Sequence, residues 1–414
     1  MSILVINAGS SSLKFGLFDA EAMEPLASGL IDWTAQSGQA ELVVRAPHSE
    51  EIRSRVDVSD HRVAVAQALR CLARTQDGAA SRGSTVAVVG HRVVHGGAVF
   101  RDSVRIDQGV KAAIGRLAEL APLHNPPALE AIEAAEAALP GAPHVAVFDT
   151  AFFASLRPDA YVYPLPYEWY TDWGVRRFGF HGISHAYCAG RAAELLGRDP
   201  ATLRLVICHL GNGCSAAAVR GGVALDTTMG FTPMEGLMMG ARSGSVDPGV
   251  LLHVQRRHGL DAERLDDALN HRSGLLGVSG SSSDFRRVEA AAGQGNERAR
   301  LALDIFARRV RSAVGGLAVG MGGIDALVFT AGVGEHSAAL RTAACEGLEC
   351  LGLRLDAGRN AACLPDGDVA HPDSAARILV IQTREELMIA REAWRLVGRG
   401  GRAGPRPPAP VLAT

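Results

Sequence analysis

The sequence lacks the features that mark several large classes of protein. Its 414 residues carry a formal net charge of −2, so no excess of basic residues points to a nucleic-acid partner. No apolar run reaches membrane-spanning length, and the first residues form no basic or apolar leader. The seven cysteines are scattered without a Cys-x-x-Cys pair, which excludes a zinc ribbon and fits reduced thiols in a reducing compartment. We therefore expect a soluble cytoplasmic protein with no membrane partner.

Several catalytic motifs are absent as well. No Gly-x-Ser-x-Gly segment occurs, so a serine hydrolase is not supported, and no Gly-Lys-Ser or Gly-Lys-Thr occurs, which excludes the Walker A phosphate loop. His181 and His185 are four residues apart, as are His91 and His95. Without a His-Glu-x-x-His motif or a clear third ligand, zinc is disfavoured. A hydrogen bond from His181 to a phosphate or a substrate is the favoured interpretation.

The sequence does contain a repeated strand-and-turn pattern. An apolar run ends at Asn7, small and hydroxylated residues fill 8–12, and Lys14 leads into an alternating apolar segment, an order that predicts strand, tight turn and strand. Small residues let a polyanion reach backbone N–H groups, so this turn is a candidate phosphate cradle; an ordinary serine-rich hairpin is the alternative. Residues 203–219 repeat the order, and 326–335 carry a third glycine-rich turn after an apolar strand. The repetition predicts a duplicated fold.

Strands and helices alternate in both halves, which indicates an α/β protein whose helices cover a sheet. We expect Asp60 to cap a first helix that breaks at Gly78, and Asn125 to cap another. Ser184 is the expected cap of a helix that ends at Gly197. The other expected elements are strands at 86–89, 145–148 and 378–381, and helices at 109–120, at 303–317 and from 383 onward.

A few charged residues stand next to these turns and strand ends. Arg92 and Arg242 lie in separate glycine-rich segments. Arginine stays charged and holds a planar anion bidentately, as a transferring phosphoryl group requires, whereas a surface ion pair is the alternative for each. Asp149 at a strand end and Glu385 at a helix start are candidate Mg²⁺ ligands. For Glu385, the alternative is an acid favoured by the helix dipole.

In order along the chain, eight segments resemble the signatures of the acetate kinase family, within the superfamily of acetate and sugar kinases, Hsp70 and actin. These segments are 5–14, 90–97, 177–185, 209–213, 239–244, 283–286, 329–335 and 383–387. The resemblance runs from residue 2 to about residue 396. It implies an α/β fold of two duplicated actin-like (ribonuclease H-like) domains, with mixed sheets flanked by helices and an active-site cleft between them.

The resemblance also implies the domain limits. Residues 1–150 with 386–397 would form the N-terminal domain, and 151–385 the C-terminal domain with the nucleotide site and the dimer surface. The tail at 398–414, rich in Gly, Arg and Pro, is expected to be disordered.

Individual roles follow from the same resemblance. The catalytic residues would be Arg92, Asp149, His181 and Arg242, and the metal would be held by Asn7 and Glu385. The substrate would contact Arg92 and an apolar wall of Val94, Leu123, Phe180 and Pro233. The nucleotide would be bound by Ser10, Ser12, Lys14, His209, Leu210, Gly211, Asn212, Gly213, Asp284, Phe285, Arg286, Gly332, Val333, Gly334, Glu335 and His336. The family assigns Asp149 an acid/base role, but acetate is already ionised near neutral pH, so orienting Mg²⁺, water or Arg92 suits this carboxylate better.

Four residues depart from the family's pattern. Ala98 and Ser245 stand where acids are usual, Ala241 replaces a threonine, and His336 replaces an asparagine at the expected adenine contact. None of these changes removes a proposed catalytic group.

The expected activity is reversible, Mg²⁺-dependent transfer of the ATP γ-phosphoryl group to acetate, which gives acetyl phosphate and ADP by direct in-line transfer. Mn²⁺ is a possible substitute metal. One alternative is a kinase for propionate or another short acid; another is a nucleotide switch like Hsp70 or actin, which the second anion site of Arg92, Arg242 and His181 disfavours. A homodimer is expected from the aromatic cluster at 161–173, the apolar face of 297–321 and the family resemblance.

Overall fold

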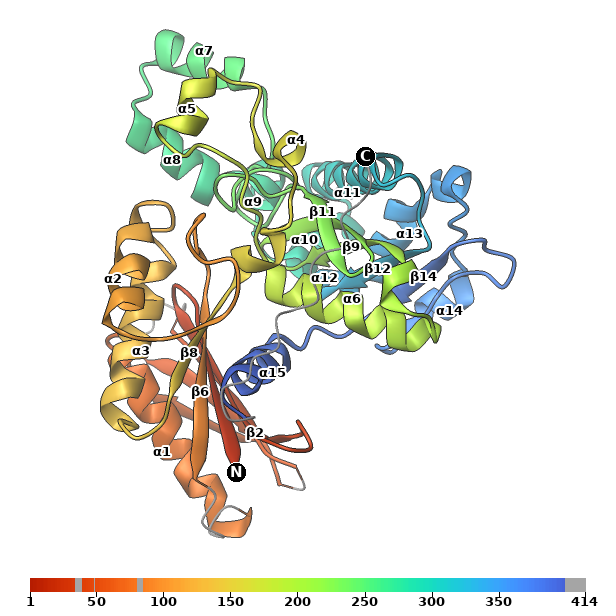
Figure 1. The fold of residues 1–414 in the computed structure, drawn as a ribbon. Coiled ribbons are helices and arrows are strands. Elements are labelled where there is room, and N and C mark those ends of the chain that lie inside the picture. The colour runs from red at the N-terminus through yellow and green to blue at the C-terminus, as the bar shows by residue number, and fades with distance from the viewer. Residues whose placement is uncertain (34–38, 48, 80–84, 399–414) are drawn as a thin grey trace. The chain divides into compact units, whose positions relative to one another are not determined.

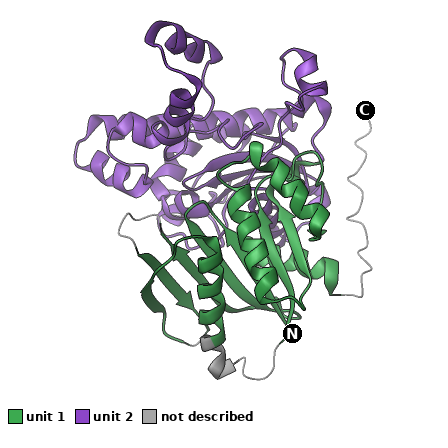
Figure 2. Ribbon diagram, turned by 90° about the vertical axis from the view of Figure 1, so that its left-hand side faces the viewer, with its two compact units in different colours: residues 1–154, 384–414 green, residues 155–383 purple. Residues whose placement is uncertain are grey.

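The computed structural model describes residues 1–33, 39–47, 49–79 and 85–398. The chain forms two compact units, which Figure 2 distinguishes by colour. Unit 1 comprises Met1–Ala154 and Arg384–Thr414, and unit 2 comprises Ser155–Thr383. Apart from Gly398, the tail predicted to be disordered lies outside the described residues.

The sheet of unit 1 mixes antiparallel and parallel strands. In the described residues its order is β5 (Ile52–Val56), β4 (Ala40–Arg45), β3 (Pro25–Asp32), β2 (Ser12–Asp19), β1 (Ser2–Ala8), β6 (Val86–Val93), β8 (His144–Phe148) and β7 (Val104–Arg105). β1 to β5 pair antiparallel in succession, β1, β6 and β8 run parallel, and β7 pairs antiparallel with β8. Every residue of β1 is buried, which accounts for its continuous apolar run.

Helices cover both faces of this sheet (Figure 1). They are α1 (His61–Ala79), α2 (Gln108–Arg116), α3 (Asn125–Ala138) and α15 (Glu385–Val397), with short 3₁₀ turns η1 (Leu117–Glu119) and η2 (Asp149–Phe153). α1 and α3 pack apolar residues such as Val65 and Ala131 against strand residues such as Leu4 and Phe15. α15 lies against β6, where a Cβ on Gly90 would meet Ile389 Cγ2 at 2.8 Å. Gly90 therefore permits the close approach of the C-terminal helix.

The sheet of unit 2 repeats this plan. Among the described residues its order is β11 (Val223–Thr227), β10 (Cys214–Arg220), β9 (Arg204–Leu210), β12 (Ala326–Thr330), β14 (Arg377–Val380) and β13 (Gly367–Asp368). β11, β10 and β9 pair antiparallel, β9, β12 and β14 run parallel, and β13 pairs antiparallel with β14. These directions match β3, β2, β1, β6, β8 and β7 one for one. The predicted α/β fold, with a duplicated mixed sheet flanked by helices, is confirmed.

The helices of unit 2 fall into two groups. Those that bury side chains are α6 (Gly182–Leu196), α9 (Gly274–Ser279), α10 (Phe285–Gly293), α11 (Glu297–Gly320), α12 (Ala331–His336), α13 (Ala338–Cys345) and α14 (Ala357–Ala361), with η4 (Leu348–Leu351). Within the described residues, α4 (Pro158–Tyr161), α5 (Tyr167–Thr171), α7 (Pro248–His258), α8 (Ala262–His271) and η3 (Pro200–Thr202) bury none. None of the described helices is long and apolar enough to cross a membrane.

Several predicted boundaries need correction. Asp60 does cap α1, since its Oδ1 accepts the N–H of Val63 at 2.9 Å, but the helix continues through Gly78. His124, not Asn125, is the N-cap of α3. His181, not Ser184, is the N-cap of α6, which ends as predicted at Gly197 with φ +60°. After β12, the third glycine-rich turn forms the helix α12.

Candidate functional site

The site residues of unit 1 gather where three parallel strands end. Asn7 lies near the end of β1, Arg92 lies near the end of the neighbouring β6, and Asp149 follows β8 directly. β1 pairs with β6, and β6 pairs with β8. The carboxyl ends of neighbouring parallel strands meet at one sheet edge, which is where α/β folds bind ligands.

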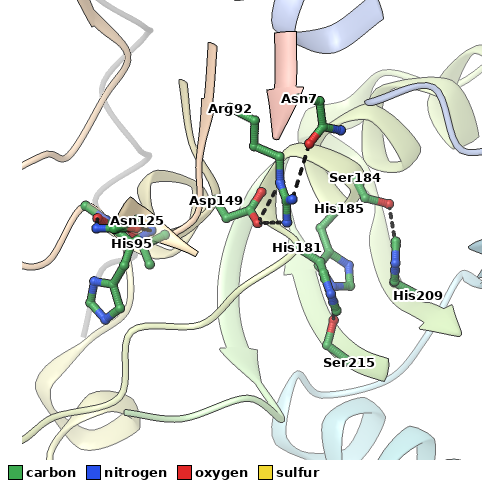
Figure 3. Close-up of polar contacts among 12 residues, drawn as sticks. Asn7, Arg92, His95, Asn125, Asp149, His181, Ser184, His185, His209 and Ser215 are labelled. Carbon is green, nitrogen blue, oxygen red and sulfur yellow. Dashed lines mark hydrogen bonds and ion pairs between the residues drawn. The ribbon is translucent and has the colours of Figure 1, made fainter. Parts of the chain in front are cut away.

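Arg92 is held by two partners at this edge (Figure 3). Its Nη2 and Nε donate to Oδ2 of Asp149 at 2.7 and 3.2 Å, and its Nη1 donates to Oδ1 of Asn7 at 3.3 Å. Asp149 is fully buried, and the Arg92 side chain is 15% exposed. Burial alone would lower the pKa of Arg92, but the carboxylates of Asp149 and Glu385 outweigh it and raise that pKa. The guanidinium is therefore a permanent charge in a fixed orientation.

Two acids at the start of α15 complete this group. Glu385 and Glu386 occupy the first turn of the helix, and both act electrostatically on Arg92. Oε1 of Glu386 accepts a hydrogen bond from Nδ2 of Asn7 at 3.4 Å. Glu386 was missed from the sequence, although it is the neighbour of Glu385 in the same motif. The position suits a metal ligand and also an acid stabilised by the helix dipole.

Oxygen donors dominate this sheet edge. No group of three or more His, Cys, Asp or Glu residues in the described part of the chain could hold a metal. The amide oxygen of Asn7 and the carboxylate of Glu385 nevertheless match the donors that Mg²⁺ takes, because Mg²⁺ uses one or two carboxylates and completes its shell with phosphates and water.

The β1–β2 turn keeps its polar groups accessible. Its backbone closes through the Gly9 N–H, which donates to the Ser12 carbonyl at 2.8 Å. Ser10 is exposed, and exposed Lys14 is the register partner of Asn7 across the hairpin. The structure thus brings the predicted phosphate residues of this turn beside the predicted metal residue.

In unit 2, His181 and Arg242 converge on Gly213. A Cβ on Gly213 would lie 2.9 Å from Nη2 of Arg242 and 3.4 Å from Nε2 of His181. Nη1 of Arg242 donates to the Pro233 carbonyl at 2.6 Å, and burial lowers the pKa of Arg242. His181 holds a left-handed φ of 57°, an uncommon backbone for a residue with a side chain. Strained backbone of this kind gathers at functional sites.

Histidine rings and serine hydroxyls hold His181 in place. Its ring stacks on His209 with centroids 4.2 Å apart and an interplanar angle of 21°. Nδ1 of His181 lies 2.9 Å from Oγ of Ser215, and Nδ1 of His209 lies 2.8 Å from Oγ of Ser184. Sequence reasoning missed Ser215. The sequence does contain a signal for this residue. His209 and Ser215 lie three residues before and after Asn212, at the tip of a predicted hairpin, so they are expected to pair.

The other predicted nucleotide residues are dispersed over unit 2. The Gly211 N–H donates to the Gly213 carbonyl at 3.1 Å and closes this turn, and the Asn212 carbonyl accepts from the Gly240 N–H at 3.0 Å, which ties the turn to the 239–244 segment. Asp284 caps α10 through the Arg286 N–H at 2.9 Å. Leu210 and Phe285 are buried in the core.

The Gly332–His336 segment forms α12 and is tied to the end of unit 2. Oε1 of Glu335 accepts from the N–H and the Oγ1 of Thr383, at 2.8 and 2.9 Å. The exposed ring of His336 contacts the Gly332 carbonyl at 3.0 Å.

The predicted apolar wall divides between the units. In unit 1, Val94 is buried and Leu123 is 49% exposed. In unit 2, Phe180 is buried and Pro233 is half-buried.

Comparison with known proteins gives a consistent result. Residues 2–391 match the model of the acetokinase family. An acetate kinase from a Cyanothece species is 51% identical over 403 residues, covering 96% of this chain and 98% of that protein. An acetate kinase from Gloeobacter violaceus is 52% identical over 407 residues, covering 96% of this chain and 100% of that protein.

Solved structures agree. The crystal structure of Porphyromonas gingivalis acetate kinase matches with a TM-score of 0.87 and 42% identity, covering 95% of this chain and 98% of that chain. A propionate kinase from Francisella tularensis matches with a TM-score of 0.86 and 36% identity, covering 94% and 98%.

Proposed function

The chain belongs to the acetokinase family, and on this premise we propose that it transfers the γ-phosphoryl group of ATP reversibly to acetate. An acetate oxygen attacks the γ-phosphorus as the bond to the ADP oxygen breaks, which gives acetyl phosphate and ADP. The observation that carries this proposal is Arg92, a fixed guanidinium held by Asp149 and Asn7 at the carboxyl ends of parallel strands. A permanent planar cation there suits both the carboxylate acceptor and the phosphoryl group.

Asp149 orients Arg92 in this mechanism. Two of the three hydrogen bonds that hold the guanidinium end on Oδ2 of Asp149. Acetate is ionised near neutral pH and offers no proton to a base. The carboxylate therefore contributes by fixing the direction of the Arg92 donors.

His181 and Arg242 stabilise the phosphoryl group during transfer. Support comes from their shared approach to Gly213, where a Cβ would lie 2.9 Å from Nη2 of Arg242 and 3.4 Å from Nε2 of His181, so both donors face one small space. Charge spread over the phosphoryl oxygens in the transition state makes such fixed donors effective, and removing one donor typically costs about 10²–10³-fold in turnover.

ATP is bound by the turn at 209–213, by 284–286 and by 332–336 in unit 2, with Ser10, Ser12 and Lys14 contributing to phosphate binding. Asn7 and Glu385 would hold Mg²⁺ or Mn²⁺, and when bound the metal neutralises charge on the phosphates. Chelation with EDTA is expected to abolish activity, and added Mg²⁺ to restore it.

Acetate is the preferred acceptor in this proposal. Buried Val94 lies two residues after Arg92, which fixes the carboxylate in this proposal, so we expect a longer tail to press against Val94. The family resemblance adds Leu123, Phe180 and Pro233, which are also bulky or rigid. One extra methylene is worth about 1–3 kcal/mol in such a pocket. Propionate is the second candidate, because the chain is similar to a Francisella propionate kinase.

The test measures kcat/KM for acetyl phosphate formation with ATP and Mg²⁺ over acids from formate to butyrate. We expect acetate to lead, propionate to follow and butyrate to fail, and Val94→Ala to raise propionate relative to acetate. Equal values for acetate and propionate, unchanged by Val94→Ala, would show that the wall does not set the chain length. Nucleotide binding with no transfer to any acid would instead favour the nucleotide-switch alternative.

We propose a cytoplasmic homodimer that assembles through unit 2. Tyr167 and Trp173 are 63% and 65% exposed, and Val319 on α11 is 71% exposed. A contiguous exposed apolar patch is typical of an interface, and these side chains are the candidates to form one. Light scattering at micromolar concentration is expected to give twice the chain mass of 43.4 kDa; a 43.4 kDa species alone would exclude the dimer.

A further inference from the structure

A single buried hydroxyl bridges two histidines in unit 2 (Figure 3). Ser215 lies on β10 and is fully buried. Its Oγ lies 2.9 Å from Nδ1 of His181 and 2.8 Å from Nε2 of His185. The two histidines stand one helical turn apart at the start of α6, so one side chain of the sheet fixes both rings.

Proton counting limits this bridge to two arrangements. A serine hydroxyl carries one proton and can accept two hydrogen bonds. Among the contacts of the described residues, Ser215 Oγ has the two rings as its partners, so its proton goes to one ring and the other ring donates to it. In the first arrangement His185 donates from Nε2, Ser215 donates to Nδ1 of His181, and neutral His181 carries its proton on Nε2. In the second arrangement the directions are reversed, and Nε2 of His181 donates only if the ring is also positively charged. His185 is neutral in both, in agreement with burial, which keeps its pKa well below the usual value.

Arg242 disfavours the charged form of the second arrangement, and the neutral form of that arrangement offers no donor at Nε2. Its Nη2 and Nε2 of His181 face the same small space, since a Cβ on Gly213 would meet both within 3.4 Å. Burial already disfavours the charge of Arg242. A second positive charge on His181 would add repulsion to that cost. The first arrangement supplies a donor at Nε2 without adding a charge.

We propose that Ser215 is a positioning residue for the phosphoryl transfer proposed above: it donates its proton to Nδ1 of His181 and so keeps the proton of the neutral ring on Nε2, beside Arg242. From there the ring donates to an oxygen of the phosphoryl group. The catalytic meaning of this arrangement rests on the proposed function, whereas the proton positions are a property of the protein without ligands.

The proton positions are read directly from the wild-type protein. Long-range ¹H–¹⁵N correlation spectra of protein labelled with ¹⁵N-histidine distinguish a ring protonated at Nδ1, at Nε2 or at both nitrogens. His181→Gln and His185→Gln assign the two sets of signals by their loss. We expect both rings to be neutral with the proton on Nε2 near pH 7.5. A proton on Nδ1 of His181 at that pH, with or without one on Nε2, would overturn the proposal.

Kinetic variants test the positioning role. Ser215→Ala removes the bridge, Ser215→Thr keeps the hydroxyl, and Ser184→Ala is the matched control, because it removes the serine contact of His209 from the same helix. Since misplacement of a catalytic group by about 1 Å can cost about 10²-fold, Ser215→Ala is expected to lower kcat by about 10–100-fold, with KM for ATP within about threefold. Ser215→Thr is expected to recover most of kcat.

The controls separate positioning from packing. Ser184→Ala is expected to alter the His209 signals and to leave the proton of neutral His181 on Nε2. Wild-type kcat in Ser215→Ala, or an equal loss of kcat with the His181 proton moved from Nε2 in Ser184→Ala, would contradict a specific role for Ser215. If the wild-type protein phosphorylates no acid, the proposed function fails, and the spectra still decide the proton arrangement.

Discussion

Arg92 in unit 1 is surrounded by carboxylates, whereas Arg242 in unit 2 is held by the backbone carbonyl of Pro233. The carboxylates raise the pKa of Arg92, while burial lowers the pKa of Arg242. The two sheets have the same strand directions, but the charge of Arg92 is compensated by carboxylates, whereas Arg242 is hydrogen-bonded to a neutral carbonyl. In the proposed function, this difference suits a cation beside the acids of unit 1 and a phosphoryl group beside the less compensated charge of Arg242 in unit 2.

Replacing either arginine should give the largest loss of turnover. Arg92→Ala and Arg242→Ala are both expected to lower kcat by at least about 10²–10³-fold, because each removes a charged donor. Their effects on stability should differ: Arg92→Ala leaves buried Asp149 without its cation and should lower the free energy of unfolding by about 3 kcal/mol. Arg242→Ala should change it by less than about 1 kcal/mol. Steady-state kinetics and urea unfolding measure both quantities.

The double variant Arg92→Ala with Asp149→Ala is the control for this prediction. It should recover part of the lost stability without recovering turnover, because the uncompensated carboxylate is gone. Equal stability losses in Arg92→Ala and Arg242→Ala would contradict the difference between the units.

Substitution in the two equivalent turns should give the next largest effect. A methyl group in Gly213→Ala would enter the space between Arg242 and His181, at 2.9 and 3.4 Å, and should lower kcat by about 10²-fold. In Gly9→Ala the methyl would meet Oγ of Ser12 at 2.8 Å, a side chain that can rotate away, so a loss of only a few fold is expected. Neither glycine has a positive φ, so both variants should fold. A larger loss of kcat in Gly9→Ala than in Gly213→Ala would contradict the prediction that the space beside Gly213 matters more for turnover.

Acid pH should have the smallest effect on turnover, because it should act on stability. Burial lowers the pKa of His91 and His144 in unit 1 and of His185 in unit 2. These groups stay neutral in the folded state but take up protons when unfolded, so their contribution is complete above about pH 6.5 and is lost as pH falls below it. The loss for each group is at most about 1.4 kcal/mol per pH unit below that value and ends at its folded-state pKa. Urea unfolding at pH 7.5 and 5.5 measures the loss.

Substitution at the paired histidines of unit 1 is the control. Nε2 of His91 lies 2.9 Å from Nδ1 of His144, so His91→Gln with His144→Gln removes two titrating groups together. The pH dependence of the double variant should be shallower than that of the wild type. An unchanged slope would show that these histidines do not carry the effect.

Local signals in the sequence predicted the central strands of both sheets and the helices α1, α2, α3, α6, α11 and α15. They did not predict the edge strands β5, β7, β11 and β13 or the other helices of unit 2. β1 with β2 and β9 with β10 follow from apolar runs broken by small polar residues, and Asp60 caps α1 as its neighbours predict. The predicted cap of α3 was wrong because a residue distant in the sequence uses the capping side chain as its hydrogen-bond acceptor. Oδ1 of Asn125 accepts the N–H of His95 at 3.1 Å instead of capping α3.

The site was predicted less completely, and for the same reason. Arg92, Asp149 and Glu385 were predicted from their places at a turn, a strand end and a helix start, and the family resemblance added the metal role of Asn7, but each only as a separate residue. The contact of Asn7 with Glu386 depends on the packing of α15 in unit 1, which no local pattern encodes. Likewise, the bridge from Ser215 to His181 depends on how α6 packs on the β9–β10 hairpin.

The discontinuity of unit 1 has a consequence for synthesis on the ribosome. Residues 1–154 leave the ribosome first, yet the face of β1, β6 and β8 on which α15 packs waits for the last helix. Unit 2, made of one continuous stretch, can close first, although domains generally fold from the N-terminus onward during translation. We therefore expect the face of β1, β6 and β8 that packs on α15 to stay uncovered until α15 has been synthesised. The helix that begins with Glu385 covers that face and brings its acids to Arg92, so completion of the first unit and assembly of its charged site occur in the same step.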